Sequence, residues 1–296
     1  MCYNFSEEFS NFINIINCEI DKIFENLKKK NNAPDLIIEG MKYAVLGGGK
    51  RVRPVLALAT AKMLNLQQEE VLNFAIAIEF IHSYSLVHDD LPAMDNDDYR
   101  RGQLSTHKKF GEANGILIGD ALLNYAFELV TNISLTTNKN TLKAINIIAD
   151  CSGYSGMIAG QVLDLYYQNN YQNDEKILFD IYQKKTGKLL SAPILCASQL
   201  ADGMYFDVLQ KYSYYLGLLF QFTDDILDCE SNFSTLGKTP NKDDSQNKFT
   251  SVKLFGLDGA KQKCKEYYEN ALNLIKEIPN NEFLLNFTSF IYNRKS

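Results

Sequence analysis

Residues 5–27, FSEEFSNFINIINCEIDKIFENL, carry a repeating apolar pattern that decides the fold class. The apolar positions follow one another at steps of three or four residues; they are Phe5, Phe9, Phe12, Ile16, Ile20, Ile23 and Leu27. Because a helical turn takes 3.6 residues, such steps place these side chains on one face of an α-helix. The stretch therefore predicts an amphipathic helix.

The same periodicity continues along most of the chain. Pro34 predicts the start of a second helix, Gly47-Gly48-Gly49 predicts its end, and a third helix is expected from near Pro54. Further helices are predicted over residues 69–90, 112–131, 141–167, 174–186, 188–201, 205–228, 259–278 and 282–293. No sustained alternation of period two is present, so we expect no sheet. Length alone favours about two domains, but helical patterning resumes directly after each polar stretch, so we expect a single all-α domain over 1–296.

The composition excludes several classes of protein. With 46% hydrophobic and 22% charged residues, the chain can bury a core, and disorder is excluded for most of its length. Its 30 basic and 36 acidic side chains give a net charge of −6, which argues against a nucleic-acid partner. We find no secretory signal and no apolar run long enough for a membrane span. Six scattered cysteines indicate reduced, buried thiols, so a cytoplasmic protein is expected.

The strongest chemical signal is the segment Asp89-Asp90-Leu91-Pro92-Ala93-Met94-Asp95, at the end of an apolar helix. Carboxylates at a helix C-terminus are disfavoured by the helix dipole. Pro92 ends the helix, because its ring cannot pack against a continuing helical turn. The resulting turn allows the carboxylates to converge.

A second acidic cluster lies in residues 220–228, FQFTDDILD. Asp224 and Asp228 are four residues apart and share one helix face, where they repel each other unless a cation lies between them. Oxygen ligands that share a metal with substrate phosphates are typical of Mg²⁺ sites. A solvated acidic face is the alternative for either cluster alone, and the presence of two clusters weighs against it.

Cationic residues follow the glycine run, in the order Lys50, Arg51 and Arg53. The segment is not a Walker A loop, because Arg51 stands where that motif needs Ser or Thr. Lysine and arginine after a flexible turn are suited to binding phosphate oxygens. His82 lies two helical turns before Asp89 and on the same face. Together, the acidic and cationic groups predict that two phosphorylated groups bind side by side.

These segments resemble the trans-prenyltransferase (polyprenyl diphosphate synthase) family over nearly the whole chain. The shared motifs are GGGKRVRP (47–54), IHSYSLVHDDLPAMD (81–95), RRG (100–102), FGEAN (110–114), GDAL (119–122), GQ-x-x-DL (160–165), KTG (185–187), FQFTDDILD (220–228) and LGK (236–238). The resemblance implies an isoprenoid-synthase-type helical bundle around a central cavity, with the acidic motifs facing each other across it. It also implies a homodimer.

The resemblance further implies the roles of individual residues. About three Mg²⁺ ions per active site would be held by Asp89, Asp90, Asp95, Asp224, Asp225 and Asp228. The allylic diphosphate would contact Arg100, Lys185, Thr186, Gln221, Lys238 and Lys248. Isopentenyl diphosphate would bind Lys50, Arg53, His82 and Arg101. Among these, the implied catalytic residues are Asp89, Asp90, Asp95, Lys185, Thr186, Gln221 and Asp224.

The implied reaction adds isopentenyl diphosphate to dimethylallyl and then geranyl diphosphate, by ionisation, condensation and elimination. Tyr84, with Ser85 beside it, lies ~7.5 Å deeper along the helix than Asp89, and a ring there would close the pocket floor. An aromatic residue at this place resembles family members that make the C15 product, farnesyl diphosphate.

Three alternatives remain open. The first is a synthase of the C20 product, geranylgeranyl diphosphate. The second is a terpene cyclase-like lyase, against which Lys50, Arg53 and Arg101 argue. The third is a non-catalytic subunit, which would have degraded acidic motifs.

Overall fold

A computed structural model of the chain describes residues 3–134, 139–170, 172–234 and 249–294. Two of the predicted diphosphate ligands, Lys238 and Lys248, lie outside the described residues. The chain divides into two compact units, Met1–Ile145 and Asn146–Ser296, which are described one at a time. The expectation of a single domain stays a prediction.

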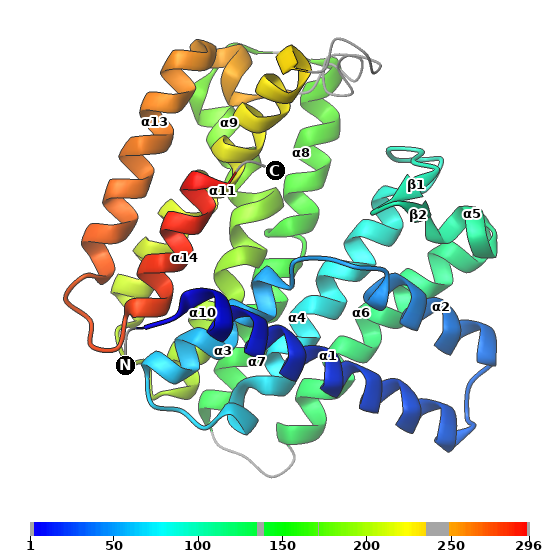
Figure 1. Ribbon diagram of the computed structural model, residues 1–296. Coiled ribbons are helices and arrows are strands. Elements are labelled where there is room, and N and C mark those ends of the chain that lie inside the picture. The colour runs from blue at the N-terminus through cyan, green and yellow to red at the C-terminus, as the bar shows by residue number, and fades with distance from the viewer. Residues whose placement is uncertain (1–2, 135–138, 171, 235–248, 295–296) are drawn as a thin grey trace. The chain divides into compact units, whose positions relative to one another are not determined.

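The first unit is helical, as its apolar pattern predicts (Figure 1). Its elements are α1 (Phe5–Lys30), α2 (Asp35–Leu46), α3 (Val52–Met63), α4 (Gln68–Asp89), β1 (Tyr99–Arg100), β2 (Gln103–Leu104), α5 (Thr106–Phe110), α6 (Glu112–Ser134) and the start of α7 (Lys139–Ser152). In α1 the predicted stripe turns inward, and Phe12, Ile16, Ile20 and Ile23 are buried. The Asn4 side chain caps this helix by accepting a hydrogen bond from the Glu7 backbone amide.

Helix α4 is the core helix of this unit and packs against α3 and α6. Among the described helices it alone is long and apolar enough to cross a membrane, but 67% of its apolar window is buried inside the protein. That burial is what a core helix requires, because an apolar helix in a folded chain has to be covered by its neighbours. Its last residue is Asp89, so the first acidic motif begins where the core ends.

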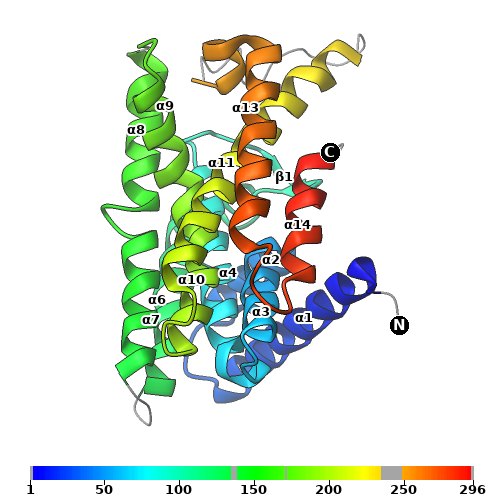
Figure 2. The same ribbon diagram turned by 90° about the vertical axis from the view of Figure 1, so that its left-hand side faces the viewer.

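The second unit is built around α11 (Phe206–Ser234), which packs against α10 (Lys188–Leu200), α13 (Ser251–Ile275) and α14 (Glu282–Asn293) (Figures 1 and 2). Its other elements are α8 (Met157–Asn169), α9 (Glu175–Tyr182) and the π-helix η1 (Gln183–Gly187). Aromatic rings fill the space between α9, α11 and α13; the ring centroids of Phe222 and Tyr267 lie 5.1 Å apart. This packing fixes the helix that carries the second acidic motif.

Four sequence predictions were wrong in detail. Residues 141–167 form two helices, α7 and α8, separated by residues 153–156. Helix α13 begins at Ser251 rather than 259, because a kink at Gly256 (φ 70°) joins two helical segments. Residues 183–187 form a π-helix instead of ending an α-helix. A short hairpin, β1–β2, pairs Tyr99 with Leu104 where no strand was expected.

The cysteines confirm the thiol prediction in part. All five that are described are reduced, and Cys151, Cys196 and Cys264 are buried. Cys18 is exposed and Cys229 is half-buried, so the prediction that these two thiols are buried was wrong.

Candidate active site

The first acidic motif folds back onto the end of α4. The Asp95 amide donates to the Asp89 carbonyl at 2.8 Å, and the Asp97 amide donates to the Asp90 carbonyl at 3.2 Å. The chain thus turns after Asp90, as Pro92 predicts. This turn brings the backbone of Asp95 against that of Asp89, although six residues of continuous helix would have kept them apart.

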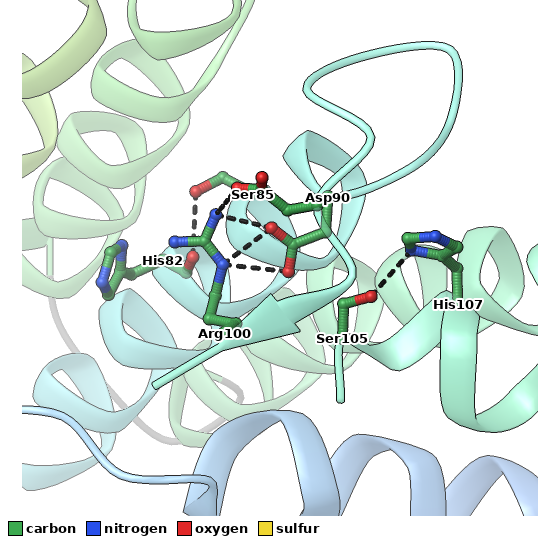
Figure 3. A network of polar contacts seen from close by, with 7 residues as sticks. His82, Ser85, Asp90, Arg100, Ser105 and His107 are labelled. Atoms are coloured by element: carbon green, nitrogen blue, oxygen red, sulfur yellow. Dashed lines mark hydrogen bonds and ion pairs between the residues drawn. The ribbon is translucent and has the colours of Figure 1, made fainter. Parts of the chain in front are cut away.

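Asp90 is engaged by Arg100 of the β1–β2 hairpin, and Figure 3 shows the two side chains in contact. Arg100 Nε lies 2.8 Å from Asp90 Oδ1 and 2.9 Å from Oδ2, and Arg100 Nη2 lies 2.5 Å from Oδ1. Burial raises the pKa of the Asp90 carboxyl, and the Arg100 guanidinium opposes that rise. Asp90 therefore anchors the arginine predicted to contact the allylic diphosphate.

The glycine run is crossed by Arg101. Arg101 Nη1 donates to the Gly48 carbonyl, and Gln103 Nε2 donates to the Gly47 carbonyl at 2.7 Å. Gly49 has a φ of 129°, a backbone conformation that residues with a Cβ rarely adopt, so glycine is favoured where Arg101 crosses the loop. The loop that begins the predicted isopentenyl diphosphate pocket is thereby joined to Arg101, more than fifty residues away.

His82 lies among the predicted cations. Its pKa is held well below 6.5, first by burial and then by the positive charges of Arg53, Arg101, Arg100 and Arg51. The imidazole is consequently neutral at pH 7. The structure thus brings Arg53, His82 and Arg101 into one cationic neighbourhood, while the fourth predicted ligand, Lys50, is exposed.

Arg51, between the two predicted ligands, has a structural contact that the sequence did not indicate. Arg51 Nη1 lies 2.8 Å from Glu79 Oε1, and each side chain is 3% exposed. Arg51 Nε also donates to Asn17 Oδ1 at 3.0 Å. This buried pair ties the cationic loop to α4 and α1. In the sequence, only the presence of an acidic residue, Glu79, inside an apolar helix could have indicated this ion pair.

The predicted chain-length residues lie one turn before the acidic motif. Tyr84 is buried, and its ring meets the His88 ring edge-on at 5.6 Å. Burial, and then the nearby Asp89 charge, raise the pKa of Tyr84 to about 12. Ser85 Oγ donates to the His82 carbonyl at 2.9 Å (Figure 3). Tyr84 is therefore a large, neutral, packed ring close to the acidic motif.

The second unit contains a pocket of about 290 Å³ that gathers most of the other predicted residues. It is lined by Asp164, Ile181, Tyr182, Lys185, Thr186, Gln221, Asp224, Asp225, Asp228, Phe249 and Thr250. Three polar residues that line this pocket were given no role by the sequence analysis; they are Asp164, Tyr182 and Thr250. The pocket therefore brings Lys185 and Thr186 together with the second acidic motif.

Lys185 and Thr186 are carried by the π-helix η1, a wide turn that is often found at functional sites. This turn lies directly against α8: a Cβ at Gly160 would be 2.1 Å from the Lys185 amide nitrogen. Lys185 Nζ lies 2.5 Å from Asp164 Oδ2, also on α8. Glycine at 160 and the Asp164 carboxylate together set the place of Lys185.

A chain of hydrogen bonds orients the amide of Gln221. Thr186 Oγ1 donates to Gln221 Oε1 at 3.0 Å, and Gln221 Nε2 donates to Asp225 Oδ1 at 3.3 Å. Asp225 Oδ2 accepts from Tyr182 Oη and, at 2.7 Å each, from the Ser251 amide and hydroxyl. Burial raises the pKa of Asp225, and these bonds oppose the rise. Asp225 is thus a buried acceptor that holds Gln221, Tyr182 and the start of α13 together.

Asp224 and Asp228 face the same pocket from α11. The Asp224 side chain is 43% exposed, and its Oδ1 accepts from Arg294 Nη2 at 2.5 Å. Among the described residues, no three His, Cys, Asp or Glu side chains are grouped as a complete metal site. Mg²⁺ is usually held by one or two carboxylates together with water and substrate phosphates, so the oxygen donors of Asp224 and Asp228 fit such an ion.

Comparison with known proteins matches residues 34–281 to the polyprenyl synthetase family. The chain belongs to this family. It is 41% identical over 297 residues to a protein of Haemophilus influenzae named farnesyl diphosphate synthase, with 99% of each chain covered. It is also 41% identical over 241 residues to a chloroplastic geranylgeranyl pyrophosphate synthase of Capsicum annuum, covering 80% of this chain and 65% of that one.

A solved structure of a geranyltransferase from Legionella pneumophila is similar to this chain with a TM-score of 0.84 and 28% identity, covering 98% of this chain and 97% of that one. The polyprenyl synthetase match spans residues of both units. Enzymes of the polyprenyl synthetase family are typically Mg²⁺-dependent.

Proposed function

We propose that the chain is a prenyltransferase that condenses isopentenyl diphosphate with dimethylallyl and geranyl diphosphate to give farnesyl diphosphate. The observation that carries this proposal is the convergence of Lys185, Thr186, Gln221 and Asp224 on one pocket of the second unit. Full-length similarity to proteins named farnesyl diphosphate synthase agrees with it.

The cationic neighbourhood of the first unit would bind isopentenyl diphosphate. Arg53 and Arg101 supply planar donors for phosphate oxygens, and Lys50 adds a point charge. A neutral His82 can donate one hydrogen bond to the same group without adding to the repulsion among the arginines. No acidic residue is needed here, because this substrate keeps its diphosphate throughout the reaction.

The acidic motifs would bind the allylic diphosphate through Mg²⁺, held by Asp89, Asp95, Asp224 and Asp228. About three ions are proposed per active site, and when bound they neutralise the charge that builds on the leaving diphosphate. Asp90 and Asp225 would act differently from our sequence-based assignment. Their hydrogen bonds suit the positioning of Arg100 and Gln221.

Arg100 and Lys185 would contact the allylic diphosphate and stabilise the charge that it gains as the C–O bond breaks. Thr186 and Gln221, joined by their hydrogen bond, would lie beside the allylic cation and present oxygen dipoles to it. The isopentenyl double bond then attacks this cation, and a proton leaves the new adduct. The released diphosphate is a suitable acceptor for that proton, since the described pocket offers no neutral histidine next to Gln221.

Tyr84 would set the product length at C15, because a buried ring one turn before the acidic motif limits the room for a growing chain. The C20 product is the second candidate, favoured by similarity to a geranylgeranyl pyrophosphate synthase. We further propose that the protein is a cytoplasmic homodimer.

The deciding experiment is chromatography of the products from dimethylallyl diphosphate with excess isopentenyl diphosphate and Mg²⁺. A predominant C15 product is expected. A C20 product would exclude the farnesyl assignment, and cyclic hydrocarbons formed without isopentenyl diphosphate would indicate a lyase. Asp224→Ala should lower kcat by several orders of magnitude, whereas Asp207→Ala, at the far end of the same helix, is a matched control.

A further inference from the structure

Arg294, directly after α14, is directed onto the second acidic motif. Its Nη2 lies 2.5 Å from Asp224 Oδ1 and 2.9 Å from the Phe220 carbonyl oxygen. Its guanidinium carbon lies 4.4 Å from the centroid of the Phe220 ring. The two residues that receive it are one helical turn apart on α11, so one cation bridges a carboxylate to the backbone of its own helix.

The burial of Arg294 distinguishes it from Lys261, another cation that pairs with a carboxylate of α11. Its side chain is 8% exposed, and its Nε has no hydrogen-bond partner among the described residues. By contrast, Lys261 pairs with Glu230 of α11 at 2.7 Å with both side chains almost half exposed. A solvated surface pair contributes little, because water and salt screen it. A buried, planar guanidinium keeps its geometry, and so it can restrict the carboxylate that it contacts.

Restricting Asp224 matters for the reaction because Asp224 and Asp228 repel each other and are one turn apart. A carboxylate that ligates a metal is usually held by a hydrogen bond from a neighbouring group, which sets its orientation before the metal arrives. Arg294 supplies such a bond and also offsets one negative charge. The bridge to the Phe220 carbonyl fixes the direction from which that bond comes.

We propose that Arg294 is a positioning residue that orients Asp224 for binding Mg²⁺ together with the allylic diphosphate. This inference rests on the proposed function. Neither the acidic motif nor its spacing indicates it, because Arg294 is 70 residues away in the chain from Asp224.

The test measures Mg²⁺ dependence of ligand binding, apart from turnover. Isothermal titration calorimetry follows the binding of geranyl S-thiolodiphosphate, an unreactive allylic analogue, at a series of Mg²⁺ concentrations. The variants are R294Q, R294K, D224N and the control K261Q. R294Q should raise the half-saturating Mg²⁺ concentration about tenfold. R294K, which keeps the charge but loses the planar fork, should raise it about threefold.

Each outcome decides between the possible roles. K261Q should leave the Mg²⁺ midpoint within about twofold of wild type, because its pair is solvated. An unchanged or lower midpoint in R294Q, with a lower Tm, would mean that Arg294 only anchors the C-terminus. If R294Q does not fold, the half-saturating Mg²⁺ concentration of R294K, compared with that of wild type, tests the positioning role instead. Mg²⁺-independent binding in the wild type and D224N alike would instead refute the proposed function.

Discussion

Gly160 on α8 lies so close to the backbone of η1 that the structure leaves no room for a side chain at this position. A Cβ at this position would lie 2.1 Å from the Lys185 amide nitrogen, 2.4 Å from the Lys185 Cα and 2.6 Å from the Lys184 carbonyl carbon. All three are backbone atoms, so no side-chain rotation can relieve the contact. For Gly160→Ala, η1 has to move away from α8 by about 1.3 Å to reach the ordinary contact distance of 3.4 Å.

That displacement carries Lys185 and Thr186 with it. A misplacement of about 1 Å in catalytic groups can lower the rate about 100-fold, or about 2.7 kcal/mol in the activation free energy. The cost to folding should be smaller, about 1–3 kcal/mol for overpacking, partly offset by the higher helix propensity of alanine. Gly160→Ala is therefore expected to fold, with a modest loss in Tm and a large loss in kcat.

Steady-state kinetics with geranyl and isopentenyl diphosphates, together with thermal unfolding by circular dichroism, measure both effects. Gly259→Ala on α13 is the matched control, because the nearest atom to its new Cβ is 3.1 Å away and belongs to the Phe255 side chain. It should keep kcat within about twofold of wild type. If Gly160→Ala also stays within about threefold of wild type, the place of Lys185 on the π-helix is not set by this close approach.

Three further changes test other parts of the site. Glu79→Gln leaves the buried Arg51 charge without its acidic partner and should cost about 3–5 kcal/mol of unfolding free energy in urea titrations. The control Glu19→Gln, which breaks a pair with the exposed Lys22, should cost under about 1 kcal/mol. Equal losses would show that burial of the Arg51–Glu79 pair does not raise its contribution to stability. Arg53→Ala should raise KM for isopentenyl diphosphate at least about tenfold, the loss expected for a charge-assisted hydrogen bond, with little change in KM for geranyl diphosphate, and the reverse order would exclude Arg53 from the isopentenyl pocket. Tyr84→Ala should shift the product from C15 toward C20 in chromatography, and an unchanged product would place the pocket floor elsewhere.

The helices and the acidic motifs follow from local sequence. The apolar stripe of residues 5–27, Pro34 before α2 and the glycines after it act over a few residues, and α1 and α2 form where they predict. The same holds for the turn at Pro92, which is dictated by one ring and confirmed by the Asp95–Asp89 backbone bond. Local steric and hydrogen-bonding rules are sufficient for such features, so a single sequence reveals them.

The partners of the charged residues were decided only by tertiary structure. Arg51 with Glu79, Asp225 with Ser251 and Asp224 with Arg294 are 28, 26 and 70 residues apart. No periodicity links residues so far apart, because these pairings depend on which helices pack together.

The family resemblance alone therefore placed Asp90 and Asp225 among the expected metal ligands. The Asp90 carboxylate accepts from Arg100, and that of Asp225 accepts from Tyr182, Ser251 and Gln221. We propose that both carboxylates position neighbouring residues instead. The π-helix likewise has no signature in the KTG motif, and its close approach to Gly160 of α8 is visible only in the folded chain. Sequence alone thus determined which charged side chains this protein has. Packing decided which of them are paired and buried, because long-range contacts fix the orientation of a charged group.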